Sequence, residues 1–164
     1  MTDLAGRTKT AVDGGESLSG PRPPALLLGA LVLEAGGSVA IPLGGGWGMH
    51  WRLAGLLPLT LGLVLVLVGD RAFKRAETPI CPGARVTALV TRGVYRLSRN
   101  PMYLGMVLIA LGFAVLLGAW SALVVPWALA LVLDRRFVRA EERRLAEQFG
   151  AHYEEYRRRV RRWI

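Results

Sequence analysis

Three long apolar stretches alternate with polar segments along the chain. The first runs from about residue 24 to 43 and contains Glu34, the second from about 51 to 69, and the third from 100 to 133 without any charged residue. A helix needs about 20 mostly apolar residues to cross a bilayer, and the bilayer interior leaves no water for unpaired backbone groups. The pattern therefore predicts an all-α, polytopic membrane protein.

The third stretch is too long for a single crossing. At about 1.5 Å per residue it would extend roughly 50 Å, against a hydrocarbon core of about 30 Å. We therefore expect a tight helical hairpin whose reversal lies at residues 118–121, Gly-Ala-Trp-Ser. This gives about four transmembrane helices and places the two ends of the stretch side by side.

Basic residues are distributed unevenly among the connections. The segment 70–99 and the region from Arg135 onward are rich in Lys and Arg, whereas residues 44–50 and the turn near Gly118 contain neither. Cytoplasmic loops carry the excess of Lys and Arg in membrane proteins. The chain is therefore predicted to be an integral, multi-pass membrane protein with both termini in the cytoplasm.

The two flanks differ in character. Residues 1–22 are polar and rich in Gly, Ser and Thr, which predicts a disordered N-terminal tail ahead of a single membrane domain over 23–164. Beyond residue 133, apolar positions recur at helical spacing among Arg and Glu, which predicts a C-terminal amphipathic cytoplasmic helix interrupted at Gly150.

Composition narrows the class of protein further. The chain has 164 residues, 52% hydrophobic and 20% charged, with a formal net charge of +9. Because the charges are separated from long uncharged stretches, they indicate a membrane protein and argue against a nucleic-acid-binding module. Cys81 is the single cysteine, which excludes an internal disulfide and a cysteine-based zinc cluster.

Polar residues suited to chemistry collect in two segments. One is 87–105, which leads into the uncharged stretch, and the other is 139–142, which follows it. If that stretch doubles back, Asn100 and Tyr103 lie near Glu141. The hairpin thus predicts a polar site at the cytoplasmic face.

The residues of these segments resemble a known family. The runs Leu-Val-Thr-Arg-Gly-Val-Tyr at 89–95, Arg-Asn-Pro-Met-Tyr-Leu-Gly at 99–105 and Arg-Ala-Glu-Glu at 139–142 are similar to the isoprenylcysteine carboxyl methyltransferases and their phospholipid methyltransferase relatives. The resemblance covers about residues 50–164. It implies an S-adenosylmethionine-dependent membrane methyltransferase that acts on a lipophilic or lipid-anchored acceptor from the bilayer.

The resemblance also implies which residues contact the cofactor. A carboxylate can pair with the cofactor's amine, tyrosine faces favour a sulfonium, and a helix N-terminus favours a carboxylate. Apolar side chains can cover the adenine. The implied contacts are Leu89, Val90, Tyr95, Asn100, Pro101, Met102, Tyr103 and Glu141.

One position departs from the family pattern. Better-known members have histidine where this chain has Asn100, and an amide cannot shuttle a proton near neutral pH. We therefore expect methyl transfer to depend on alignment and desolvation, with no side-chain base. An acceptor carboxylate, already ionised, would need none. No residue is assigned as catalytic.

Other interpretations of the same residues stay open. Residues 99–101 also suit a plain helix start, and Glu141 and Glu142 also suit a first turn of exposed ion pairs. A noncatalytic scaffold or accessory subunit that keeps the fold is the alternative function. The sequence leaves the role of Glu34 and the oligomeric state unassigned. It also does not choose among prenylated cysteine, a phospholipid amine, an isoprenoid acid and a hydrophobic xenobiotic as acceptor.

Overall fold

The computed structural model describes residues 21–41, 43, 48–76 and 88–164, and these form helices and connections without a strand. The predicted all-α class is confirmed for this part of the chain. Nearly all of the predicted disordered tail, residues 1–20, lies outside the described residues. The loop residue Cys81 lies outside them as well.

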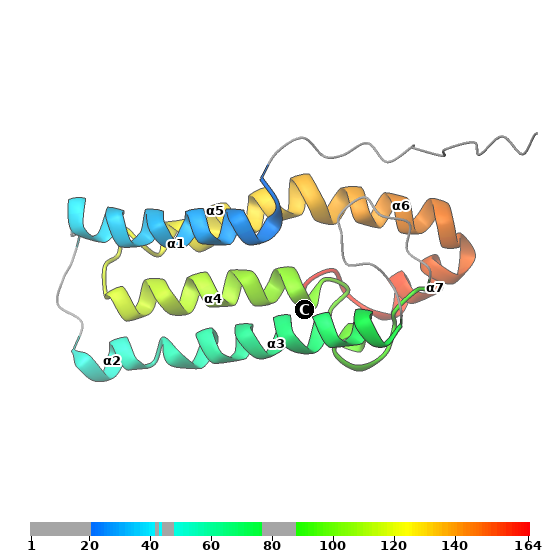
Figure 1. The fold of residues 1–164 in the computed structure, drawn as a ribbon, viewed down its shortest axis with the longest axis horizontal. Coiled ribbons are helices and arrows are strands. Elements are labelled where there is room, and N and C mark those ends of the chain that lie inside the picture. The colour runs from blue at the N-terminus through cyan, green and yellow to red at the C-terminus, as the bar shows by residue number, and fades with distance from the viewer. Residues whose placement is uncertain (1–20, 42, 44–47, 77–87) are drawn as a thin grey trace, which may run out of the picture.

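The helices form a bundle that extends at one end into two further helices (Figure 1). In the bundle, α1 and α5 both pack on α4, and α4 packs along α3. The elements are α1 (Pro23–Ala40), α2 (Met49–Leu53), α3 (Leu56–Arg75), the 3-10 turn η1 (Gly93–Arg96), α4 (Pro101–Leu117), α5 (Val124–Leu133), the π-helical turn η2 (Asp134–Val138), α6 (Arg139–Phe149) and α7 (Ala151–Arg159).

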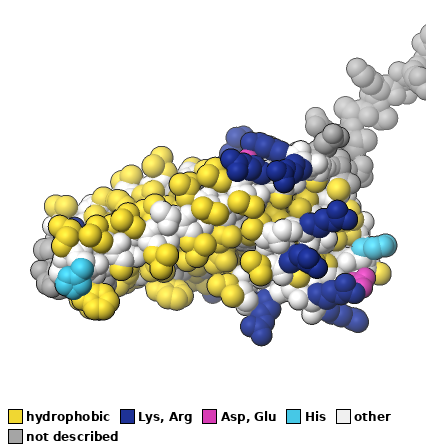
Figure 2. Space-filling view, turned by 90° about the horizontal axis from the view of Figure 1, so that it is seen from below, with side chains coloured by type: hydrophobic (Ala, Val, Ile, Leu, Met, Phe, Trp, Pro, Cys, Tyr) yellow, Lys and Arg dark blue, Asp and Glu magenta, His cyan; other side chains and the backbone are white. Residues whose placement is uncertain are grey.

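Two helical segments are long and apolar enough to cross a membrane. They are Pro23–Ala40 and Met49–Arg75, and α4 is a shorter apolar helix. The first two agree with the stretches expected near 24–43 and 51–69, although α3 continues to Arg75. Its last turn carries Lys74 and Arg75, and cations are favourable at a helix C-terminus. Figure 2 shows apolar side chains over the bundle and Lys and Arg gathered towards one end, here called the charged end.

The uncharged stretch reverses at the expected place. Helix α4 ends at Leu117, and Gly118 adopts the left-handed conformation with φ of 70°, which glycine reaches without strain. Helix α5 begins at Val124 and packs on α4 around the buried core residues Ala110 and Leu129. Helix α5 then continues through η2 into α6, so the start of α4 and the start of α6 meet at the charged end.

Glycines hold α3 and α4 at close range. A Cβ atom added at Gly62 would lie 2.5 Å from the carbonyl oxygen of Gly105, and one at Gly55 would lie 2.5 Å from that of Gly112. Such backbone contact is possible only between residues without side chains. We call Gly55, Gly62, Gly105 and Gly112 the glycine seam. It fixes the register of α4 against α3.

The chain after α6 folds back toward the bundle. Gly150, with φ of 51°, separates α6 from α7, as the sequence predicts. Tyr153, Tyr156 and Val160 are buried in one cluster, against which Leu89 packs. The backbone N–H of Arg99 then donates to the carbonyl of Arg161 at 3.0 Å. The last residues are thereby joined to the segment that leads into α4.

Candidate active site

A short hydrogen bond at the charged end joins Tyr103 and Glu141. The Tyr103 hydroxyl donates to Glu141 Oε1 at 2.6 Å, across 38 positions of sequence. Tyr103 lies in the first turn of α4 and is buried, and Glu141 lies in the first turn of α6. The predicted proximity of the two residues is therefore confirmed.

Glu141 has an electrostatic environment suited to a cationic ligand group. Burial raises the pKa of its carboxyl group, whereas the Tyr103 hydrogen bond and the nearby Arg144 lower it. A half-buried carboxylate with a single neutral donor gains free energy when a cation arrives.

Arg144 supplies the opposite charge next to this carboxylate. Its Nη1 atom is buried and has no hydrogen-bond partner in the described segments. Buried donors are normally paired, so an orphaned guanidinium nitrogen indicates a position for an acceptor. Arg144 follows Glu141 by three residues on α6, and residues at this spacing lie on one helix face. Together the two side chains offer complementary charges to a zwitterion.

Aromatic rings flank the pair. Tyr95 in η1 is buried, and its ring meets Phe73 of α3 edge-to-face at 5.5 Å between centroids. Burial raises the pKa of Tyr95, with Tyr156 and Glu141 adding to the effect, so its hydroxyl stays neutral at physiological pH. Phe137 lies 6.2 Å from the Tyr103 ring. Phe137 belongs to the π-helical turn η2, a local irregularity that is frequent at functional sites.

Asn100 is bound to the C-terminal backbone. Its side-chain amide donates to the carbonyl of Arg162 at 3.2 Å, and its own N–H donates to Ser98 Oγ at 3.1 Å. Pro101 begins α4, which has no side-chain cap. The backbone N–H groups at the N-terminus of α4 therefore have no side-chain cap. The hydrogen bond from Asn100 to the Arg162 carbonyl helps to hold this helix end in place.

The other predicted contacts occupy different positions. Met102 lies against Gly69 of α3, where an added Cβ would be 2.6 Å from Met102 Cγ. Leu89 and Val90 are half-buried in a segment without regular secondary structure, and Leu89 packs on the Tyr153 and Tyr156 cluster. The structure thus brings Tyr95, Tyr103 and Glu141 into one region, and Leu89 faces α7.

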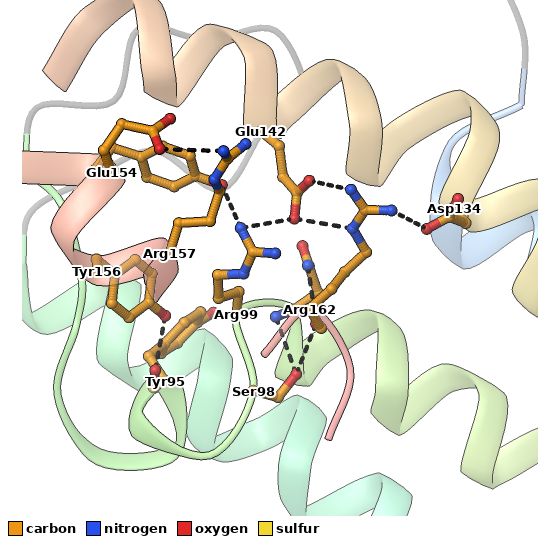
Figure 3. A network of polar contacts seen from close by, with 11 residues as sticks. Tyr95, Ser98, Arg99, Asp134, Glu142, Glu154, Tyr156, Arg157 and Arg162 are labelled. Atoms are coloured by element: carbon orange, nitrogen blue, oxygen red, sulfur yellow. Dashed lines mark hydrogen bonds and ion pairs between the residues drawn. The ribbon is translucent and has the colours of Figure 1, made fainter. Parts of the chain in front are cut away.

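Ion pairs that the sequence did not predict form a cluster beside this region (Figure 3). Glu142 pairs with Arg99 at 3.2 Å and with Arg162 at 2.7 Å, and Arg162 also reaches Asp134 at 3.4 Å. The Arg162 carbonyl accepts from Ser98 and Asn100. We call Arg99, Asp134, Glu142 and Arg162 the charge cluster. It joins the α4 entry, η2, α6 and the C-terminal residues.

The signal for this cluster was weak because its members are far apart in sequence. Arg162 is one of many C-terminal arginines, and Arg99 resembles an ordinary charged boundary. In the sequence, only the position of Glu142 next to Glu141 indicates where this cluster lies. Both histidines stay outside the region, with His50 exposed on α2 and His152 exposed on α7.

Comparison with known proteins gives a consistent result. A sequence model of the phospholipid methyltransferase family matches residues 51–152. Two rice proteins (Oryza sativa subsp. indica and subsp. japonica), each named probable protein-S-isoprenylcysteine O-methyltransferase, are 36% identical over an alignment of 114 residues. The alignment covers 61% of this chain. The chain spans 57% of the length of these curated relatives. The matched residues include α3, α4, α5, α6 and the Tyr103–Glu141 pair, and the chain belongs to the phospholipid methyltransferase family.

Proposed function

We propose that this protein transfers a methyl group from S-adenosylmethionine to a lipophilic acceptor at the cytoplasmic face of a membrane. The observation that carries the proposal is the Tyr103–Glu141 hydrogen bond beside the orphaned Arg144 nitrogen. Membership of a methyltransferase family and the names of the rice relatives support the reaction type.

The proposed membrane placement follows from the helices and their charges. In it, α1, α3, α4 and the helix that begins with α5 cross the bilayer, and the charged end faces the cytoplasm. Both termini would then be cytoplasmic. The bundle surface supports this placement, because its exposed side chains include many large hydrophobic residues such as Val39, Leu57 and Trp127.

The residues of the charged end fit the cofactor. Its amino acid portion carries an ammonium and a carboxylate, which match the Glu141 carboxylate and the buried Arg144 nitrogen. The rings of Tyr95 and Tyr103 suit a sulfonium through their quadrupoles. In the proposal Leu89, Val90, Met102 and the α4 N-terminus at Asn100 and Pro101 complete the binding region.

The cofactor supplies an electrophilic methyl group on a positively charged sulfur. With the cofactor bound, the residues of the charged end would hold this methyl group towards an acceptor oxygen or nitrogen, which would receive it. A carboxylate acceptor is neutralised to an ester, so no proton moves. Because the Asn100 side chain is bound to the Arg162 carbonyl and cannot act as a base, the arrangement favours such an acceptor.

Cofactor binding can be tested without knowledge of the acceptor. Titration of the purified protein in detergent with S-adenosylhomocysteine should give a saturable heat in calorimetry. Glu141→Gln keeps the shape of the side chain and removes the charge, and we expect it to weaken binding at least tenfold. Glu147→Gln is the matched control, because Glu147 is exposed on the same helix.

The outcomes separate the proposal from its alternative. Tight binding that only Glu141→Gln weakens supports the enzyme. A noncatalytic membrane scaffold would be favoured if the unchanged protein gave no heat and if S-adenosylhomocysteine left its thermal unfolding profile unaltered. Equal weakening by both variants would show that the charge on α6 acts from a distance and that Glu141 does not contact the ligand.

A further inference from the structure

A cavity lies at the charged end, apart from the Tyr103–Glu141 pair. It has a volume of about 1020 Å³ and lies between the segment 89–96 and the region of α7. Neither Tyr103 nor Glu141 lines it. Tyr156 borders it and donates its hydroxyl to the Tyr95 carbonyl at 2.7 Å, so this hydrogen bond stands between the cavity and the candidate active site.

The cavity is basic. Among the described residues its lining contains three arginines, Arg92, Arg96 and Arg159, together with His152 and the single carboxylate Glu155. Glu155 is paired with Arg159. The guanidinium groups of Arg92 and Arg96 make no ion pair in the described part of the chain and are exposed. Two cations are thus directed at one cavity without a compensating charge.

The cavity also has an apolar wall. Leu89, Phe149 and Val160 line it, and they belong to the same cluster as buried Tyr153. A basic patch for a fully solvated ion needs no such wall. A ligand that suits both surfaces has an anionic group attached to an apolar body, and guanidinium forks match phosphate oxygens in particular.

The position of the cavity points to the membrane surface. Leu97, next to Arg96, is 74% exposed, so an apolar side chain lies beside the cationic ones on the surface of the charged end. Figure 2 shows Lys and Arg side chains gathered at the charged end, beyond the apolar surface of the bundle. In the proposed membrane placement this end lies at the level of the lipid headgroups.

We propose that the cavity between segment 89–96 and α7 binds the phosphate of an anionic phospholipid, with Arg92 and Arg96 as its cationic ligands. The apolar wall receives the adjoining glycerol and acyl carbons. Binding fastens segment 89–96 to α7 and thereby steadies Leu89 and Tyr95 beside the candidate active site. The inference uses the proposed membrane placement and does not require methyl transfer.

The test measures lipid binding directly. Water-soluble short-chain phosphatidylglycerol, short-chain phosphatidylcholine and inorganic phosphate are titrated separately into the protein in detergent, with tryptophan fluorescence as readout. We expect phosphatidylglycerol to bind at least tenfold more tightly than either of the others. Each arginine near an anionic headgroup changes affinity about fivefold, so Arg92→Gln with Arg96→Gln should weaken phosphatidylglycerol binding about twenty-fivefold.

A charge-matched control keeps the test specific. Arg143→Gln with Arg158→Gln removes two exposed cations that do not line the cavity, and we expect less than a threefold change. Both double variants should keep the thermal unfolding midpoint in detergent alone. Equal losses in the two double variants, equal binding of phosphatidylcholine, or equally tight binding of inorganic phosphate would each overturn the lipid site. A failure here with intact S-adenosylhomocysteine binding would leave the proposed function in place.

Discussion

The glycine seam and the charge cluster both position α4, by opposite means. In the seam, α3 and α4 touch through backbone atoms, and a Cβ at Gly62 would meet the Gly105 carbonyl at 2.5 Å. In the charge cluster, long side chains bridge the gap between the segments. The Glu142 carboxylate, for example, pairs with both Arg99 and Arg162. The seam depends on the absence of side chains and the cluster on their charges.

The difference follows from the two environments. Helix packing inside a membrane gains little from the hydrophobic effect, so close backbone contact supplies the attraction. At the charged end, ion pairs with side chains only 10–12% exposed, such as Arg99–Glu142, are partly shielded from water. We infer that the seam sets where α4 lies, and that the cluster sets how Glu141 faces Tyr103.

The largest expected effect breaks the seam. Gly62→Leu would force α3 and α4 apart, because the new Cβ would lie within 3 Å of the Gly105 carbonyl and the Ile109 N–H. We expect a loss of about 3 kcal/mol in the free energy of unfolding. Thermal unfolding in detergent measures the loss. Gly29→Leu is the control, since nothing lies within 4 Å of a Cβ at Gly29. Equal stability of the two variants would refute the seam.

Loss of Glu142 tests the charge cluster. Glu142→Ala leaves the poorly exposed Arg99 without its carboxylate, and we expect a loss of about 2 kcal/mol in stability. Glu154→Ala removes a comparable partner of Arg157 from an exposed pair, and should cost less than about 0.5 kcal/mol. The same thermal assay compares them. If the two variants unfold alike, the charge cluster does not join the four segments.

A smaller change concerns the pH dependence of ligand binding. The Tyr103 hydrogen bond lowers the pKa of Glu141, which burial raises. Ligand amine binding needs the ionised carboxylate, so affinity should fall as the pH drops through that pKa. Tyr103→Phe should move this midpoint to higher pH and weaken S-adenosylhomocysteine binding about tenfold at neutral pH. Calorimetry across a pH series measures both. An unchanged midpoint would mean that the hydrogen bond is absent from the ligand-free protein.

The smallest expected effect lies on the surface of α3. Lys74 pairs with Asp70 one turn away, and the lysine side chain is 69% exposed. Lys74→Met should change the free energy of unfolding by about 0.3 kcal/mol. A shift as large as that of Glu142→Ala would show that exposure does not separate the weak pairs from the strong ones.

Sequence patterns were sufficient for the all-α class, the two long apolar helices, the reversal and the central pair. The length of an apolar stretch and the position of a glycine act locally. The turn at Gly118 and the break at Gly150 could therefore be located from the sequence. The Tyr103–Glu141 contact followed from the hairpin alone.

The tertiary contacts of the charged end could not be derived in the same way. Whether Arg162 or one of its arginine neighbours meets Glu142 depends on the path of the chain after α7. The binding of Asn100 to a backbone carbonyl 62 positions away is likewise set by that path. Periodicity carries no information about either contact.

The most direct test of the central claim follows the methyl group itself. Membranes that contain the protein are incubated with methyl-labelled S-adenosylmethionine, the lipids are extracted, and the labelled product is identified by mass. We predict a labelled lipophilic product for the unchanged protein and for Glu147→Gln, and none for Glu141→Gln. Equal labelling by the unchanged protein and by Glu141→Gln would contradict the account, and so would the absence of a labelled product from the unchanged protein.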